Sequence, residues 1–356
     1  MPNDIIISVV GARPHLTKVY PFVKAMANRK TKHFIVHTGQ HYSNEMSNIF
    51  FDQFSMPIPN INLNVGSGTH AEQTANVMIG VEKIVLDLKP IGVVVYGDTN
   101  STLGATLAAA KHYYPVVHIE AGVRCDKKHM PEEINRKVID HSSDYLICPS
   151  ELAVQNLKRE GLIKGVMNLG DFMYDTFLTV KTVAQKKETI LPALGLEQNN
   201  YYLSTIHREA STNNASVLVA LIETLGDLDK PVILPMHPRT QNCLKEVGFN
   251  LEKTGNLKII DPVGHLEIIQ FLLNANKVIT DSGGLQKEAY WAGVPCITMM
   301  DETTWPETLE AGWNVLVGLD TQKIRLSAAS PLPEGTRPEV YGAPGAALRL
   351  VNAMGW

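Results

Sequence analysis

Short apolar runs alternate with amphipathic helical segments along almost the whole chain, and this alternation limits the possible folds more than any other feature. Residues 5–10 read Ile-Ile-Ile-Ser-Val-Val, and residues 92–96 read Gly-Val-Val-Val-Tyr. Continuous apolar runs of this length are typical of parallel strands that are buried on both faces. A segment with helical spacing follows each run. The pattern predicts a doubly wound parallel α/β sheet.

The alternation forms two series, separated by a change of composition at residues 181–200. We therefore expect an N-terminal Rossmann-like domain at residues 1–170, a C-terminal one at 171–340, and a C-terminal helix at 341–356 that packs back on the N-terminal domain. The two halves would face a cleft. Strands are expected at residues 5–10, 34–37, 92–96, 115–119 and 145–148, then at 201–206, 232–235, 257–260, 277–280, 295–298 and 315–317. Residues 44–54 are expected to be helical and residues 56–68 irregular.

Composition and charge exclude several classes of protein. The chain has 356 residues, a net charge of −4 and four cysteines without a CxxC pair. These values argue against a nucleic-acid coat, a polybasic membrane anchor, a zinc site and a disulfide framework. No run of about 18 apolar residues occurs, so we expect a cytoplasmic protein without membrane insertion. The run Gly66-Ser67-Gly68 lacks the third glycine of a dinucleotide fingerprint, and no cofactor or metal is predicted.

A strand-to-helix turn at Ser282-Gly283-Gly284 is the best candidate for binding a phosphate. Two glycines allow the backbone to approach a ligand closely, and the N-terminus of the following helix favours an anion. Glu288 lies about one turn into that helix, where a carboxylate can reach a ribose hydroxyl. Many α/β turns contain paired glycines without binding any ligand, so the turn alone does not decide the matter.

Polar residues follow nearly every expected strand. Ligands of open parallel sheets bind beyond the carboxyl ends of the strands, so these residues form the candidate site. The cations can meet a pyrophosphate, and the carboxylates can act as acid or base. Asp98 could instead cap a helix, and Glu132 could serve only to stabilise the N-terminus of its helix through the helix dipole. His265 is among the histidines that receive no role. The candidates are Arg13, Lys18, Gln40, His41, Asp98, Glu120, Glu132, His207, Arg208, His237 and Arg239.

Eight short motifs in series resemble the signatures of the non-hydrolysing UDP-N-acetylglucosamine 2-epimerases. They extend from the first strand to about Gly318. Each motif is weak alone, but their order and spacing make the resemblance specific. They are Gly11-Ala12-Arg13-Pro14, Thr38-Gly39-Gln40-His41, Tyr96-Gly97-Asp98-Thr99, His118-Ile119-Glu120-Ala121-Gly122, Pro131-Glu132-Glu133-Ile134-Asn135-Arg136, Thr205-Ile206-His207-Arg208, Thr280-Asp281-Ser282-Gly283-Gly284 and Pro306-Glu307-Thr308.

The resemblance implies the GT-B fold, a homodimer, and inversion at C2 of a UDP-linked 2-acetamido sugar for surface polysaccharide precursors. The family eliminates UDP to form a 2-acetamidoglucal and then adds UDP back. By resemblance, Asp98, Glu120 and Glu132 match the acid/base carboxylates, and His207 matches a catalytic histidine near the diphosphate. The residues that match the family's UDP site are Arg13, Lys18, Ser282, Gly283, Gly284 and Glu288.

The chain departs from the typical UDP-N-acetylglucosamine enzymes at several positions, and the late motif is one of them. Where they read Thr-Glu-Arg-Pro-Glu, this chain reads Thr303-Thr304-Trp305-Pro306-Glu307. The run Asp301-Glu302-Thr303-Thr304-Trp305, together with Glu310-Ala311-Gly312-Trp313-Asn314, looks more like the subgroup that acts on UDP-2,3-diacetamido-2,3-dideoxyglucuronate, so the sugar stays open between the two. Two further alternatives are a GT-B glycosyltransferase, which shares the fold, and a non-catalytic UDP-sugar binding protein.

Overall fold

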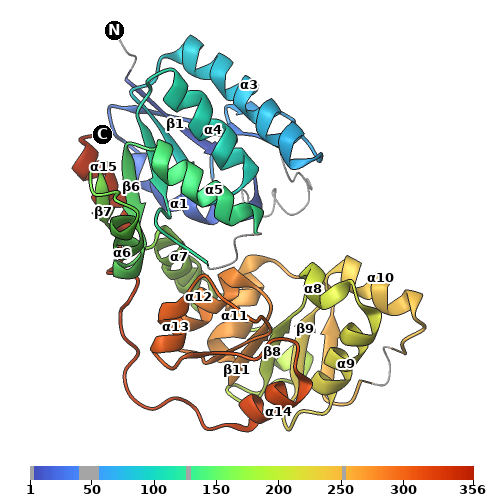
Figure 1. Cartoon of the computed structure of the whole chain (residues 1–356). Coiled ribbons are helices and arrows are strands. Elements are labelled where there is room, and N and C mark those ends of the chain that lie inside the picture. Colours follow the sequence, from blue (N-terminus) through green and yellow to red (C-terminus); the bar gives the residue numbers. More distant parts are fainter. Residues whose placement is uncertain (1–3, 40–55, 126–129, 251–253) are drawn as a thin grey trace. The chain divides into compact units, whose positions relative to one another are not determined.

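The computed structural model describes residues 4–39, 56–125, 130–250 and 254–356, apart from the side chains of Arg13, Pro238 and Arg239. The chain divides into two units (Figure 1). Unit 1 combines Met1–Thr176 with Glu339–Trp356, and unit 2 is Phe177–Pro338. The first boundary falls inside helix α7 (Phe172–Lys186). No described helix is both long enough and apolar enough to cross a membrane.

Unit 1 contains a parallel sheet with seven strands among the described residues. The strand order is β3-β2-β1-β4-β5-β6-β7, so the order reverses between β1 and β4. That reversal is the point at which doubly wound sheets bind their ligands. The strands are β1 (Ile5–Val10), β2 (Lys32–His37), β3 (Ile61–Asn62), β4 (Gly92–Tyr96), β5 (Val116–Ile119), β6 (Tyr145–Cys148) and β7 (Val166–Asn168).

Helices pack on both faces of this sheet, as its apolar strands require. Ile7 and Val93 are fully buried in one cluster with Val77 and Val81 of α3. The other face holds α1, and the C-terminal helix α15 lies next to α1 (Figure 1). The helices of unit 1 are α1 (Arg13–Met26), α3 (His70–Leu88), α4 (Asn100–Lys111), α5 (Pro131–Ser142), α6 (Glu151–Arg159) and α15 (Ala346–Met354).

Unit 2 repeats the same topology with six strands among its described residues, in the order β10-β9-β8-β11-β12-β13. Here the order reverses between β8 and β11. The strands are β8 (Tyr202–Thr205), β9 (Val232–Pro235), β10 (Leu257–Ile260), β11 (Lys277–Thr280), β12 (Cys296–Thr298) and β13 (Asn314–Leu316). The helices are α8 (Glu209–Thr212), α9 (Ala215–Gly226), α10 (Pro238–Glu246), α11 (His265–Asn274), α12 (Gly283–Ala292), α13 (Pro306–Glu310) and α14 (Thr321–Ala329), with a short 3-10 helix, η1 (Pro192–Leu194).

The predicted fold class, two doubly wound parallel α/β halves, is confirmed. Every predicted strand is present, with ends within two residues of the prediction. Two strands were not predicted: β3, inside a segment expected to be irregular, and β7. They have two and three residues, too few to carry a periodic pattern, and both are only partly buried. The helix expected at residues 44–54, like Gln40 and His41, lies outside the described residues.

Candidate functional site

In unit 1, an ion pair joins two of the predicted site residues. Lys18 lies on α1, and Glu120 follows β5 directly. The Lys18 Nζ is 2.7 Å from the Glu120 Oε1, and the side chains are 8% and 10% exposed. A Cβ added at Gly97 would lie 3.0 Å from the Lys18 Nζ and 3.7 Å from the Glu120 Oε1. The missing side chain at Gly97 therefore lets this ion pair lie against the end of β4.

Glu120 also has an unusual backbone conformation. Its φ is +76°, in the left-handed region that residues other than glycine rarely adopt. Such a conformation costs on the order of 1–3 kcal/mol and persists only where the surroundings enforce it. Here the Glu120 N–H donates to the carbonyl of Ile147 on β6, which holds the peptide in place. Strain of this kind at a carboxylate beyond a strand end is typical of a functional residue.

Two residues of helix α5 hold Asp98 in place. Its Oδ2 is 2.5 Å from Nη2 of Arg136, and its backbone carbonyl accepts a bond from the Asn135 side chain at 2.8 Å. Burial acts to lower the pKa of Arg136, but the Asp98 and Glu133 carboxylates outweigh it and raise that pKa. The alternative role as a helix cap falls away, because the side chain of Thr99 is the N-cap of α4.

The two carboxylates at the start of α5 differ in their surroundings. Glu133 is buried, and it accepts the N–H of Cys125 at 3.0 Å and bonds from Arg136. Glu132 is only half-buried, and its carboxylate forms no hydrogen bond or ion pair with the described residues. Glu133 is therefore engaged by neighbouring residues, whereas no described residue binds the Glu132 carboxylate.

In unit 2, His207 and Asp281 meet where the strand order reverses. His207 follows β8 and is 48% exposed, whereas Asp281 follows β11 and is fully buried. The His207 Nδ1 is 2.9 Å from the Asp281 Oδ1. The same carboxylate accepts the backbone N–H groups of His207 and Arg208. Burial acts to raise the pKa of Asp281, but these hydrogen bonds together with the His207 ring lower it.

The Ser282-Gly283-Gly284 turn opens helix α12, as predicted. The Ser282 Oγ accepts the N–H of Leu285 at 3.4 Å, which caps the helix. A Cβ added at Gly283 would lie 3.7 Å from Nη2 of Arg208 and 3.9 Å from Nε1 of Trp305. Two side-chain N–H donors thus lie beside the positive end of α12. This set of groups suits an anion that carries several oxygens.

A buried cation supports this part of the site. Lys287 is fully buried on α12, and its Nζ lies 3.6 Å from the centroid of the Trp305 ring. A cation against a tryptophan face is favourable and holds the indole in place. Trp305 was noted in the sequence for its departure from a motif, but its contact with Lys287 was not predicted.

Glu288 is paired with a histidine that sequence reasoning missed. The His265 Nε2 is 2.6 Å from the Glu288 Oε1, and the side chains are 11% and 9% exposed. His265 is the first residue of α11, five residues beyond the end of β10. Its place after a strand end was the only signal for it in the sequence.

Three other predicted residues have less structural detail. Arg13 is the first residue of α1, and Arg239 lies in the first turn of α10. The side chains of both lie outside the described part of the chain. His237, beyond β9, is exposed. No group of histidine, cysteine, aspartate or glutamate residues that could hold a metal ion occurs among the described residues.

Comparisons with known proteins identify relatives over the whole length of the chain. A family model described as UDP-N-acetylglucosamine 2-epimerase matches residues 24–355. A UDP-N-acetylglucosamine 2-epimerase homolog of Methanococcus maripaludis is 42% identical, covering 98% of this chain and 99% of the relative. A UDP-2,3-diacetamido-2,3-dideoxy-D-glucuronate 2-epimerase of Pseudomonas aeruginosa is 41% identical, covering 98% of this chain and 99% of the relative.

Solved structures agree with these relatives. The Methanocaldococcus jannaschii UDP-GlcNAc 2-epimerase, in complex with UDP-GlcNAc and UDP, superposes with a TM-score of 0.88 at 38% identity and covers 99% of both chains. A glycosyltransferase of Streptomyces nogalater has a TM-score of 0.54 at 12% identity, covering 99% of this chain and 98% of that one. That likeness shows the shared GT-B-like fold alone. The chain therefore belongs to the UDP-N-acetylglucosamine 2-epimerase family, as an isomerase of the non-hydrolysing type.

Proposed function

We propose that the chain inverts C2 of a UDP-linked 2-acetamido sugar, in the manner of UDP-N-acetylglucosamine to UDP-N-acetylmannosamine. The observation that carries this proposal is the pair of carboxylates beyond neighbouring strands. Asp98 follows β4 and Glu120 follows β5, and a cation holds each of them. The Methanocaldococcus jannaschii enzyme in complex with UDP-GlcNAc and UDP supports the same substrate class.

The chemistry requires groups that exchange protons at C2 on both faces of the sugar. The C2 hydrogen is not acidic enough for simple deprotonation. A carboxylate therefore removes it while the C1–O bond breaks, and the electron pair of that bond leaves with UDP. The product is a 2-acetamidoglucal with a C1–C2 double bond. UDP then adds back at C1 while C2 receives a proton on the opposite face. We assign these transfers to Asp98, Glu120 and Glu132.

We assign the nucleotide to residues of unit 2 and to basic residues near strand ends. The diphosphate would lie at the start of α12, where Ser282, Gly283 and Gly284 offer backbone N–H groups. Arg208 would neutralise it, and His207 would act at the leaving oxygen. Glu288, oriented by His265, would accept a ribose hydroxyl. The residues proposed to complete the UDP site are Arg13, Lys18, His237 and Arg239.

Solvent deuterium tests the reaction directly. The purified chain is incubated with UDP-N-acetylglucosamine in deuterated water, with a chelator and without an acceptor sugar. We expect the epimer to appear with deuterium at C2, because the proton that returns comes from the enzyme and solvent. Asp98→Asn, Glu120→Gln and Glu132→Gln should each slow the reaction by about 100- to 10,000-fold. Asp87→Asn, at an exposed position on α3, is the control. Consumption of substrate without label at C2 would exclude this mechanism.

A second substrate has its own support. The Pseudomonas aeruginosa relative is a UDP-2,3-diacetamido-2,3-dideoxy-D-glucuronate 2-epimerase at 41% identity. Trp305 stands where the typical UDP-N-acetylglucosamine enzymes carry arginine, and its indole lies beside Gly283. Offering the two UDP sugars separately and comparing kcat/KM decides between them.

In either case the reaction would supply a precursor of surface polysaccharides. The resemblance also supports a homodimer in the cytoplasm, and light scattering tests the oligomeric state.

A further inference from the structure

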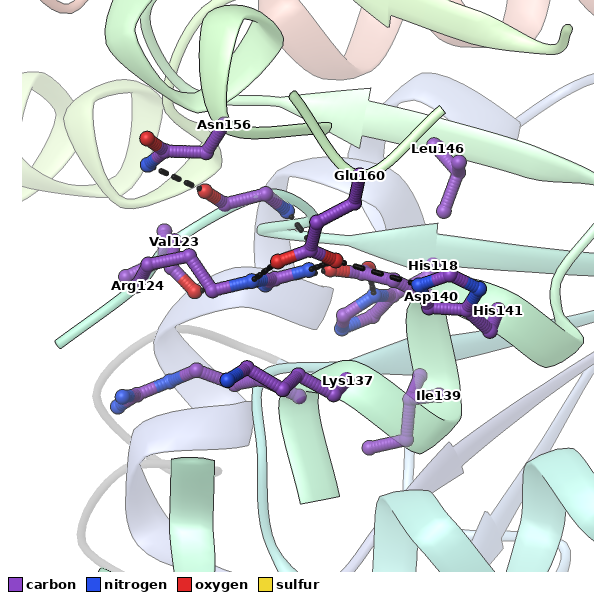
Figure 2. Close-up of polar contacts among 12 residues, drawn as sticks. His118, Val123, Arg124, Lys137, Ile139, Asp140, His141, Leu146, Asn156 and Glu160 are labelled. Atoms are coloured by element: carbon purple, nitrogen blue, oxygen red, sulfur yellow. Dashed lines mark hydrogen bonds and ion pairs between the residues drawn. The ribbon is translucent and has the colours of Figure 1, made fainter. Parts of the chain in front are cut away.

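A buried group of charged side chains lies next to the loops that carry Asp98 and Glu120 (Figure 2). His118 belongs to β5 and Asp140 to α5, and their side chains are 1% and 0% exposed. Arg124 and Glu160 complete the group. Burying charges is costly unless they are paired, so such a group needs a reason to be retained.

The hydrogen bonds of His118 and Asp140 form one continuous path. The His118 Nε2 is 2.8 Å from the carbonyl oxygen of Gly97, and its Nδ1 is 2.6 Å from the Asp140 Oδ1. The Asp140 Oδ2 in turn accepts the N–H of Gly122 at 3.1 Å. Gly97 immediately precedes Asp98, and Gly122 comes two residues after Glu120. One histidine–aspartate pair therefore joins the two loops that carry these carboxylates.

Both glycines are also held on their other sides. The Gly97 N–H donates to the carbonyl of Ile119 at 3.0 Å. The Gly122 carbonyl accepts the side-chain amide of Asn156 at 3.0 Å (Figure 2). Their φ values are +65° and +78°, which glycine adopts without strain. The N–H and the carbonyl of both glycines are thus bonded, so the path is tied to the backbone of each loop.

The partners of His118 determine where its protons lie. A carbonyl oxygen can only accept, so the Nε2 facing Gly97 carries a proton. Asp140 accepts bonds from Arg124, at 2.7 Å, and from the Gly122 N–H, as an ionised carboxylate does. Burial acts to raise the pKa of Asp140, but His118 and Arg124 outweigh burial and lower it. Acceptor oxygens thus face both nitrogens of the ring, an arrangement that a doubly protonated imidazole would satisfy.

The rest of the group balances the resulting charges. Arg124 binds Glu160 through two bonds, at 2.7 and 2.8 Å. If the His118 ring is doubly protonated, it and Arg124 face Asp140 and Glu160, two cations with two anions. Glu160 also contacts His141 at 3.2 Å, where the group reaches the surface. Cys148 of β6 lies near Asp140, and burial raises the pKa of that thiol, so it stays neutral.

We propose that His118 and Asp140 are positioning residues, and that a doubly protonated His118 ring fixes the placement of Asp98 relative to Glu120. The proposal rests on the proposed function, because it assigns these two carboxylates to the transfers at C2. Displacing a reacting group by about 1 Å can cost on the order of 100-fold in rate. Neither positioning residue needs to contact the substrate.

Two substitutions test the two hydrogen bonds of the His118 ring one at a time. His118→Asn keeps a donor near the position of Nδ1 and loses the bond to Gly97. His118→Gln keeps a donor near the position of Nε2 and loses the bond to Asp140. We expect either change to lower kcat on the order of 100-fold, with KM for the UDP sugar within about twofold, because UDP is held elsewhere. His141→Gln, at the exposed end of the same group, should leave both constants unchanged.

Nitrogen NMR tests the protonation of the ring in the unaltered protein. In the full chain labelled with 15N-histidine, the signals that His118→Gln removes belong to His118. We expect both nitrogens to show the shifts of protonated imidazolium at neutral pH. A neutral ring, or a folded His118→Asn variant with wild-type kcat, would overturn the proposal. If the wild type itself fails to exchange deuterium at C2, the proposed function fails, and the NMR result still stands by itself.

Discussion

The His207 ring and the Asp281 carboxylate lie 2.9 Å apart at the ends of neighbouring strands of unit 2. Asp281 accepts a hydrogen bond from the His207 Nδ1 and from two backbone N–H groups, so it fixes both the ring and the peptide that carries it. When Nδ1 donates to the carboxylate, the other nitrogen of a neutral ring is left as an acceptor. Asp281 is therefore the residue that sets the orientation and tautomer of His207.

Asp281→Asn should disrupt this arrangement. An amide has one oxygen instead of two, so it cannot accept every bond that the carboxylate accepts, and its NH2 group can donate to the histidine. We expect kcat to fall on the order of 100-fold, with a smaller change in KM. Steady-state kinetics check this result, and Asp227→Asn, at an exposed position of the same unit, is the control. Wild-type kcat in a folded Asp281→Asn variant would show that His207 needs no such partner.

Lys18 offers a test of two assignments, because the sequence resemblance placed it at the nucleotide and the structure places it on Glu120. Lys18→Met removes the cation while keeping much of the side-chain volume. If the pair with Glu120 is its main role, kcat falls by about 10- to 100-fold and KM changes little. A large rise in KM with unchanged kcat would instead indicate a contact with UDP. In a double-mutant cycle, Lys18→Met and Glu120→Gln should be strongly non-additive, since the two side chains touch.

Gly283→Ala should separate folding from binding. An added Cβ would meet Arg208 and Trp305 only at 3.7 and 3.9 Å, which is ordinary contact distance. The variant should therefore fold as the wild type does, with an equal or higher melting temperature. The methyl group would nevertheless occupy space beside the start of α12. Crowding of this size typically costs about 1–3 kcal/mol, so UDP should bind about 10- to 100-fold more weakly in calorimetry. Unchanged affinity would place the diphosphate elsewhere.

His33 should make the stability of unit 1 depend on pH. Its Nε2 is 2.8 Å from the Ser8 hydroxyl, Phe22 packs edge-on against the ring, and burial lowers its pKa from 6.5 to about 4. Below pH 6.5 the His33 ring binds a proton in the unfolded chain. In the folded chain the ring stays neutral until the pH falls to about 4. The free energy of unfolding therefore falls as the pH drops through this window, by up to about 3 kcal/mol at low pH.

Chemical denaturation at pH 7 and pH 4.5 measures this loss. His33→Gln keeps a group that can bond to Ser8 but does not titrate, so the difference between the two pH values should shrink. An equal loss in both proteins would mean that other groups cause the effect.

The sequence was most informative where a residue follows a strand. Asp98, Glu120 and His207 were found because apolar runs mark the strands of a parallel sheet, and the carboxyl ends of such strands carry the site. The Ser282-Gly283-Gly284 turn was found for the same reason, since glycines at a strand-to-helix junction have a local physical meaning.

The partners of these residues could not be predicted. Lys18 and Glu120 are 102 residues apart, and Asp140 reaches His118 only because α5 packs beside β5. Such pairs depend on how helices pack on the sheet, which leaves no local pattern in one sequence. The left-handed backbone of Glu120 is equally hidden, because glutamate has no preference for that conformation. Sequence reasoning thus proposed the candidate groups, and the structure was needed to show what holds them.

The division of the chain into units has a consequence for its synthesis. Unit 2 is one continuous stretch, whereas unit 1 needs the last residues of the chain as well as the first. The Asp175 carboxylate accepts the backbone N–H groups of Gly345 and Ala347, and Trp356 packs on Phe22. On the ribosome, unit 2 can therefore fold as soon as it emerges. Unit 1 lacks one of its helices until α15 has been made, although most of unit 1 precedes unit 2 in the sequence. A chain that stops before α15 would leave Asp98 and Glu120 on an incomplete unit 1.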